Sequence, residues 1–135
     1  MFKSKKALQA VIGILAVAPL VSGLIGLSGI RNPLFSEALP ADLVLDSNLR
    51  FLNAMSVAVA ISFYCVIPVI EKETFAFRVV CGAVWLGGIG RLISIYDLGV
   101  PPLFIIGFLA LELLAPILII YWQKQIALPV KRDVI

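Results

Sequence analysis

Histidine is absent from this chain, and cysteine occurs only twice, as Cys65 and Cys81. The absence of histidine removes the commonest metal ligand and the usual general base of enzymes. The two cysteines form no CxxC pair, and no run of residues has the spacing of a metal site. We therefore expect no metal, no cofactor and no catalytic residue, and the sequence favours a non-enzymatic protein over an enzyme.

Charged residues are also scarce, at 14% of the chain, whereas a soluble domain has about 25%. Hydrophobic residues make up 61% of the chain, and its mean hydropathy is +1.09. A chain of 135 residues cannot bury so much apolar surface within itself, because a small globule is mostly surface. The composition therefore predicts a single integral membrane domain, residues 1–135, whose main partner is the lipid bilayer.

Four apolar runs reach the roughly 20 residues that a helix needs to cross a bilayer. They cover residues 7–30, 51–70, 77–98 and 102–122, and residues 31–50 form the long outer loop. The first run exceeds the apolar core of a signal peptide, which has about 7–15 residues, so we expect an uncleaved span. The predicted fold is all-α, an antiparallel four-helix membrane bundle. We expect Asp46 and Ser47 as N-caps of the second span, and Tyr121, Trp122 and Gln123 as an interfacial anchor at the end of the fourth.

The basic residues predict how the spans are oriented. If the spans alternate in direction, only Arg31 and Arg50 flank one side, and eight basic residues flank the other. These eight are Lys3, Lys5, Lys6, Lys72, Arg78, Lys124, Lys131 and Arg132. By the positive-inside rule the crowded side is cytoplasmic, so we expect both termini in the cytoplasm. Topology thus accounts for the net charge of +3, and we expect no nucleic-acid partner, because no basic stripe with interleaved aromatics is present.

Two charged residues, Arg91 and Glu112, fall inside predicted spans, where a charge costs about 2.5–3.5 kcal/mol on insertion scales. Counting 1.5 Å per residue places Arg91 about 10 Å and Glu112 about 15 Å below the outer ends of their spans. A short turn joins these antiparallel spans, so the two residues should be neighbours. An ion pair between Arg91 and Glu112 is the simplest arrangement in which lipid tolerates both.

Other polar and small residues share a helix face with these charges. Helical periodicity places four residues on the same arc of about 120° as Arg91, namely Gly87, Gly90, Ser94 and Asp97. We expect one polar cluster that opens outward, formed by Asp46, Arg50, Asn53, Arg91, Ser94, Asp97 and Glu112. Three interpretations stay open: polar contacts that hold helices together, a ligand site, or contact with a larger partner.

Several motifs follow one another between residues 46 and 123. In order, they are D-x-x-x-R-F, E-K, F-R, G-G-x-G-R-x-x-S, G-x-P-P, E-x-x-x-P and W-Q. The series resembles a family of small four-span bacterial membrane proteins that is known only as a domain of unknown function. The resemblance implies the four-helix fold and the bacterial cytoplasmic (inner) membrane, and it implies no activity. Asn53 and Ala54 depart from the small residues, often glycine, at the start of the family's second span, which puts close helix packing there in question.

Two classes of function follow. The first is a non-enzymatic protein that binds a hydrophobic or amphipathic, lipid-like small molecule, or that acts as an accessory subunit, in a homo-oligomer or a larger membrane complex. The second is a membrane enzyme or a proton-coupled carrier that uses Glu112 with Arg91, because a buried carboxyl group can serve as acid or base. The missing catalytic repertoire favours the first class. No inverted repeat is visible, so a carrier of this size would have to dimerise.

The eight-to-two division of basic residues generates a topology prediction. A cysteine introduced into the Arg31–Arg50 loop should react with a membrane-impermeant thiol reagent in intact cells. Cysteines introduced near either terminus should react only after the membrane is permeabilised. The reverse labelling pattern would show that the positive-inside rule has been misapplied to this chain.

Overall fold

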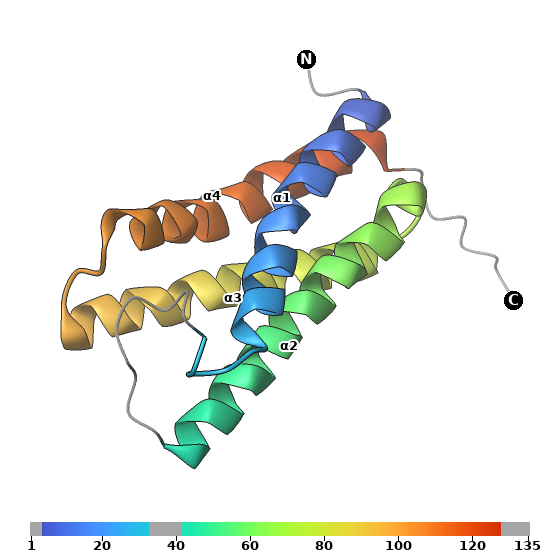
Figure 1. Cartoon of the computed structure of the whole chain (residues 1–135). Coiled ribbons are helices and arrows are strands. Elements are labelled where there is room, and N and C mark those ends of the chain that lie inside the picture. The colour runs from blue at the N-terminus through green and yellow to red at the C-terminus, as the bar shows by residue number, and fades with distance from the viewer. Residues whose placement is uncertain (1–3, 33–41, 128–135) are drawn as a thin grey trace, which may run out of the picture. The chain divides into compact units, whose positions relative to one another are not determined.

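The computed structural model describes residues 4–32 and 42–127 of the chain (Figure 1). Four helices follow one another: α1 (Lys5–Gly26), α2 (Leu43–Val66), α3 (Thr74–Leu98) and α4 (Leu103–Ile126), with a short 3-10 helix, Ile67–Val69, after α2. Each of the four is long and apolar enough to cross a membrane. The predicted all-α membrane fold with four spans is therefore confirmed.

The start of α2 differs from its prediction. The helix begins at Leu43 rather than at Phe51, and its N-cap is Asp42, whose Oδ1 accepts a hydrogen bond from the backbone N–H of Leu45 at 2.9 Å. Asp46 and Ser47 lie inside the helix, so their prediction as N-caps was wrong. The middle of the predicted outer loop, residues 33–41, and three of the basic residues used for topology, Lys3, Lys131 and Arg132, lie outside the described residues.

The chain divides into two compact units. One contains residues 12–65, which form most of α1 and almost all of α2. The other contains the start of α1, up to Val11, together with the 3-10 helix, α3 and α4.

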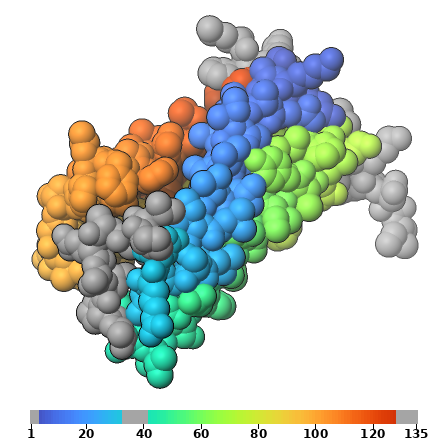
Figure 2. Space-filling view, in the orientation of Figure 1, coloured from blue at the N-terminus to red at the C-terminus, as the bar shows by residue number. Residues whose placement is uncertain are grey.

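In the unit of residues 12–65, α1 and α2 lie side by side (Figures 1 and 2). Gly23 permits this approach, because a Cβ atom there would come within 2.7 Å of the backbone oxygen of Asn53. Gly26 likewise faces the side chain of Asn53 with no room for a Cβ. At the other end of the pair, the Tyr64 hydroxyl donates a hydrogen bond to the carbonyl of Gly13 at 3.1 Å. Close packing at Asn53 is thus supplied by glycines on α1.

In the second unit, α3 and α4 form an antiparallel hairpin. The turn begins at Gly99, whose φ of +99° favours glycine, and Pro102 precedes the first residue of α4. Within the hairpin, a Cβ on Gly88 would lie 2.8 Å from Cδ2 of Leu113, so Gly88 is the residue that lets α4 come close. By contrast, Gly87 and Gly90, which periodicity places on one arc with Arg91, face open space.

Glutamine side chains form hydrogen bonds at the end of this unit that holds the α2–α3 connection. Gln123 is fully buried, and its Nε2 donates to the carbonyl of Ile70 at 3.0 Å and to Oγ1 of Thr74 at 2.9 Å. Gln9 donates to the carbonyl of Ile67 at 2.7 Å. Of the three residues expected in the interfacial anchor, Gln123 is buried and its amide nitrogen has backbone and hydroxyl partners, whereas Tyr121 is exposed.

An ion pair lies at the same end, where Nζ of Lys5 is 2.7 Å from Oε2 of Glu71. The hydrogen bond from Lys5 holds the pKa of the Glu71 carboxyl below its ordinary value. Together with the glutamine contacts, this pair brings the start of α1, the α2–α3 connection and the end of α4 to one end of the unit. The described basic residues at these three places therefore lie at one end of the unit, and the side of the membrane on which that end lies stays a prediction.

The close packing of α1 and α2 generates a stability prediction. Gly23→Ala should lower the free energy of unfolding by about 1–3 kcal/mol, because the new methyl group meets backbone atoms of α2 that cannot move aside cheaply. Gly107→Ala on α4 is the matched control, since a Cβ there would meet no atom within 4 Å. Thermal unfolding in detergent measures both variants. Equal stability of the two variants would show that α2 does not approach Gly23 as closely as described.

Candidate functional site

Arg91 and Glu112 meet across the α3–α4 hairpin. Nε of Arg91 donates a hydrogen bond to Oε2 of Glu112 at 2.7 Å. At 1.5 Å per residue, Arg91 lies about 10 Å from the end of α3 at Leu98, and Glu112 lies about 14 Å from the start of α4 at Leu103. The deeper carboxylate therefore holds the guanidinium below the level at which α3 ends.

The pair leaves hydrogen-bonding capacity unused. The bond from Nε is the one hydrogen bond that Arg91 makes within the described residues, although a guanidinium has five N–H donors. The Arg91 side chain is 42% exposed and that of Glu112 is 24% exposed. In a span, the surroundings of such a side chain are lipid, a ligand or another protein, and lipid offers no acceptor.

Within its own unit, the surface of α3 around Arg91 is uncovered. We call it the open face, and it consists of Gly87, Gly90, Arg91, Ser94 and Asp97. A Cβ atom on Gly87 or Gly90 would meet no atom within 4 Å, and Ser94 and Asp97 are exposed. Within the unit that holds α3 and α4, these residues therefore pack against nothing, and Arg91 lies at the edge of the open face, where α3 meets α4.

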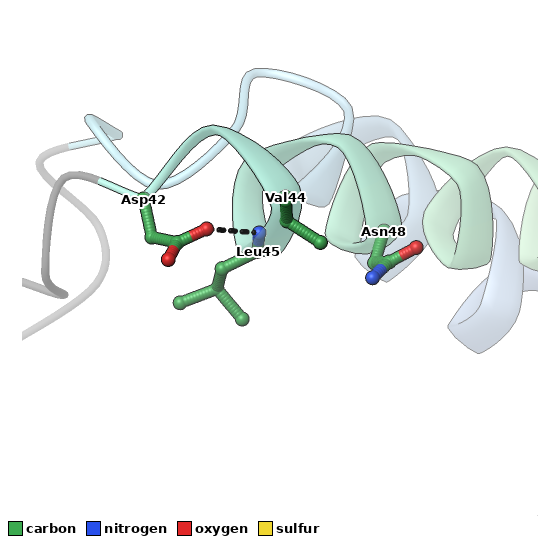
Figure 3. Close-up of a pocket in the computed structure, with 4 residues that line it drawn as sticks. All are labelled: Asp42, Val44, Leu45 and Asn48. Atoms are coloured by element: carbon green, nitrogen blue, oxygen red, sulfur yellow. Dashed lines mark hydrogen bonds between the residues drawn. The ribbon is translucent and has the colours of Figure 1, made fainter.

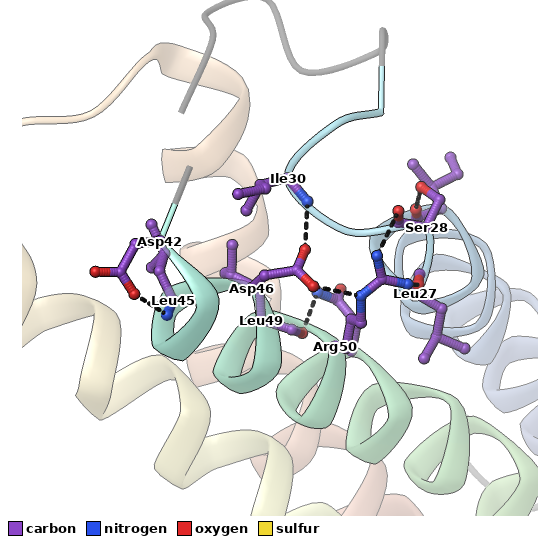
Figure 4. A network of polar contacts seen from close by, with 10 residues as sticks. Leu27, Ser28, Ile30, Asp42, Leu45, Asp46, Leu49 and Arg50 are labelled. Atoms are coloured by element: carbon purple, nitrogen blue, oxygen red, sulfur yellow. Dashed lines mark hydrogen bonds and ion pairs between the residues drawn. The ribbon is translucent and has the colours of Figure 1, made fainter. Parts of the chain in front are cut away.

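Asp46 and Arg50 form a second polar group, shown in Figure 4, in the unit of residues 12–65. Nε of Arg50 lies 2.7 Å from Oδ2 of Asp46, and its two terminal nitrogens donate to the carbonyls of Leu27 at 2.8 Å and Ser28 at 3.2 Å. Oδ1 of Asp46 accepts the backbone N–H of Ile30 at 3.0 Å. These bonds satisfy carbonyls at the end of α1 that have no partner within the helix, so the group acts as a clamp on the α1 terminus.

Two further residues complete this clamp. Gly29 has a φ of +82° and leaves no room for a Cβ beside Asp46 and Arg50. The Asn53 amide donates to the carbonyl of Leu49 at 2.7 Å and packs on Gly26. Every predicted site residue on α2 is thus engaged in holding α1 and α2 together. That all seven predicted residues form one cluster stays a prediction.

A shallow hollow near the start of α2 is lined by Asp42, Val44, Leu45 and Asn48 (Figure 3). All four residues come from the first turns of one helix, and Asp42 is already used as the N-cap. The hollow therefore lacks polar groups that converge from several elements, which is what a binding site for a small molecule requires.

The remaining residues with reactive side chains offer little chemistry. Cys65 is exposed, Cys81 is buried, and neither forms a disulfide. Within residues 4–32 and 42–127, no three histidine, cysteine or acidic residues are placed to hold a metal ion. The open face with its ion pair is therefore the strongest candidate site in the described part of the chain.

Comparison with known families identifies the family of this chain. The model of the family described as "Domain of unknown function (DUF4345)" matches residues 7–123, which include part or all of each of the four helices. The chain belongs to this family. No curated protein and no solved structure matches the chain. Both the clamp and the open face lie within the DUF4345 match.

The Arg91–Glu112 contact generates a double-mutant prediction. Arg91→Met or Glu112→Gln alone should destabilise the protein, because the remaining group loses its partner, and an unpaired charge in a span costs about 2.5–3.5 kcal/mol. The double variant should recover much of the loss, since no unpaired charge remains. Thermal unfolding in detergent of all four proteins measures the coupling, with Arg78→Met on the same helix as the control. Additive losses would show that the two side chains do not interact.

Proposed function

We propose that this protein is a non-enzymatic subunit of a membrane assembly, and that the open face of α3 receives a helix of its partner. The observation that carries the proposal is that Gly87 and Gly90 face empty space beside a half-exposed Arg91. Small residues let helix backbones approach closely in lipid, and polar side chains then bond across the interface. A partner helix would cover both the glycines and the guanidinium.

The cost of leaving this face against lipid supports the proposal. A half-exposed arginine with one hydrogen bond is expensive in a span, and a helix face without side chains gains little contact with lipid tails. The half-exposed arginine and the glycine face would not stabilise an isolated α3–α4 hairpin, whereas both would stabilise an interface with another helix. The close contact that α3 makes with α4 uses Gly88, so the glycines of the open face remain unexplained by the fold alone.

We place the assembly in the bacterial inner membrane with both termini in the cytoplasm. The basic residues at the start of α1, at the α2–α3 connection and at the end of α4 support this orientation under the positive-inside rule. The bacterial location is supported by the sequence resemblance.

One observation favours a second candidate, an amphipathic ligand at the same place. The terminal nitrogens of Arg91 have no hydrogen bond within the described residues, and they would suit an anionic headgroup. A membrane enzyme or a proton-coupled carrier would instead require Glu112 to exchange protons during its cycle. The contact with Arg91 gives that role no particular support.

Native mass spectrometry of the protein purified in mild detergent tests the proposal. An assembly heavier than one 14.6 kDa chain is expected. Gly90→Leu should disrupt it by filling the open face, while Gly107→Leu, at an equally open glycine on α4, should not. A single chain that carries a bound lipid-sized molecule would favour the second candidate. A single chain with nothing bound would contradict both.

A further inference from the structure

We infer that the partner at the open face is a second copy of this chain, and that the Arg91–Glu112 pairs of the two copies join into one network of four charged groups. This inference rests on the proposed function, and it names the partner. Three properties of the described chain support it: the charge of the pair, its depth, and the residues along α3.

Charge complementarity is the first property. An arginine with a carboxylate is neutral as a pair, and it offers unused N–H donors beside an acceptor. A purely anionic partner would suit Arg91 but would be repelled by Glu112. A second identical pair, turned so that each arginine faces the other copy's glutamate, supplies both an acceptor and a donor. A twofold interface provides this arrangement, because each contact occurs twice in opposite directions.

Depth is the second property. Two copies inserted in the same direction, related by a twofold axis along the membrane normal, bring identical residues to identical depths. The Arg91 guanidinium is bonded to Glu112, which lies about 14 Å from the start of α4, so we expect it to stay below the headgroups. A lipid would have to draw its headgroup below the interface to reach the pair, which is costly. A second copy, by contrast, has its own Arg91 and Glu112 at the same depth as the pair.

The third property is a regular series of side chains on α3. Positions spaced alternately four and three residues apart form one stripe, and most of them are small: Ala76, Val80, Ala83, Gly87, Gly90, Ser94 and Asp97. This 4-3 spacing is that of a left-handed helix pair, and the small residues permit close approach. Asp97 is next to the last residue of α3, at the end that faces water, where repulsion between two copies is screened.

Disulfide cross-linking in native membranes tests the interface without disturbing the ion pair. Ser94→Cys, in a chain that also carries Cys65→Ala and Cys81→Ala, should form a covalent dimer on mild oxidation. Leu114→Cys is the matched control, because Leu114 is 61% exposed but lies on the opposite side of α4 from Glu112. We expect several-fold more dimer from Ser94→Cys. Equal yields from the two positions would overturn the inference.

Charge reversal tests the network itself. Arg91→Glu and Glu112→Arg chains, carrying different tags, are produced separately and together. Each variant alone would bring four like charges together, whereas the mixed pair restores two of each sign. We expect the mixed dimer to exceed either like dimer by about tenfold, the ratio given by about 1.4 kcal/mol. Absence of any preference for the mixed dimer would contradict the network.

The outcomes separate this inference from the proposed function. If the purified protein is heavier than one chain because it contains a different protein, and Ser94→Cys gives no dimer, the second copy is excluded and the subunit role stands. If the protein is a single chain, both fail. If the charge-reversed chains do not fold, the Ser94→Cys experiment still decides, because it keeps Arg91 and Glu112 intact.

Discussion

A bilayer interior contains no water, so every polar group in a span needs a partner within protein, and this constraint governs the arrangement of the DUF4345 chain. The backbone meets it by forming four long helices. The polar side chains differ in how completely they find hydrogen-bond partners. Among the described residues, Gln123 leaves one buried oxygen without a partner, and the Arg91–Glu112 pair leaves N–H donors unused on an exposed side chain.

Elsewhere the polar side chains are used locally. Three nitrogens of Arg50 contact Asp46 and the carbonyls of Leu27 and Ser28, just after α1. Gln123 and Gln9 satisfy carbonyls around the α2–α3 connection. Arg50 and the two glutamines therefore stabilise connections between elements rather than present groups to a partner. By contrast, Arg91 makes one hydrogen bond within the described residues and stays half exposed. The same residue type thus has a structural role on α2 and a candidate binding role on α3.

The sequence predicts those features that depend on hydrophobic length and on depth along a helix. The four spans follow from apolar runs, and the proximity of Arg91 and Glu112 follows from two antiparallel helices with a short turn. It does not predict the start of α2, because Leu43 and Val44 are apolar but follow a segment that contains Pro33 and Pro40, and Asp42, Asp46 and Ser47 are all able to cap a helix. It also does not predict that Gly88 faces α4, because adjacent glycines differ only in direction around the helix. The role of Gln123 depends on a contact with a turn some fifty positions away, at Ile70.

The most direct test of this account exchanges the two charges within one chain. The variant Arg91→Glu with Glu112→Arg keeps an ion pair at the same place, whereas either reversal alone puts two like charges together. If the pair holds the α3–α4 hairpin as described, thermal unfolding in detergent should show the exchanged variant close to the unmodified protein and each single reversal well below it. An exchanged variant as unstable as the sum of the two single reversals would contradict the central claim that Arg91 and Glu112 are partners.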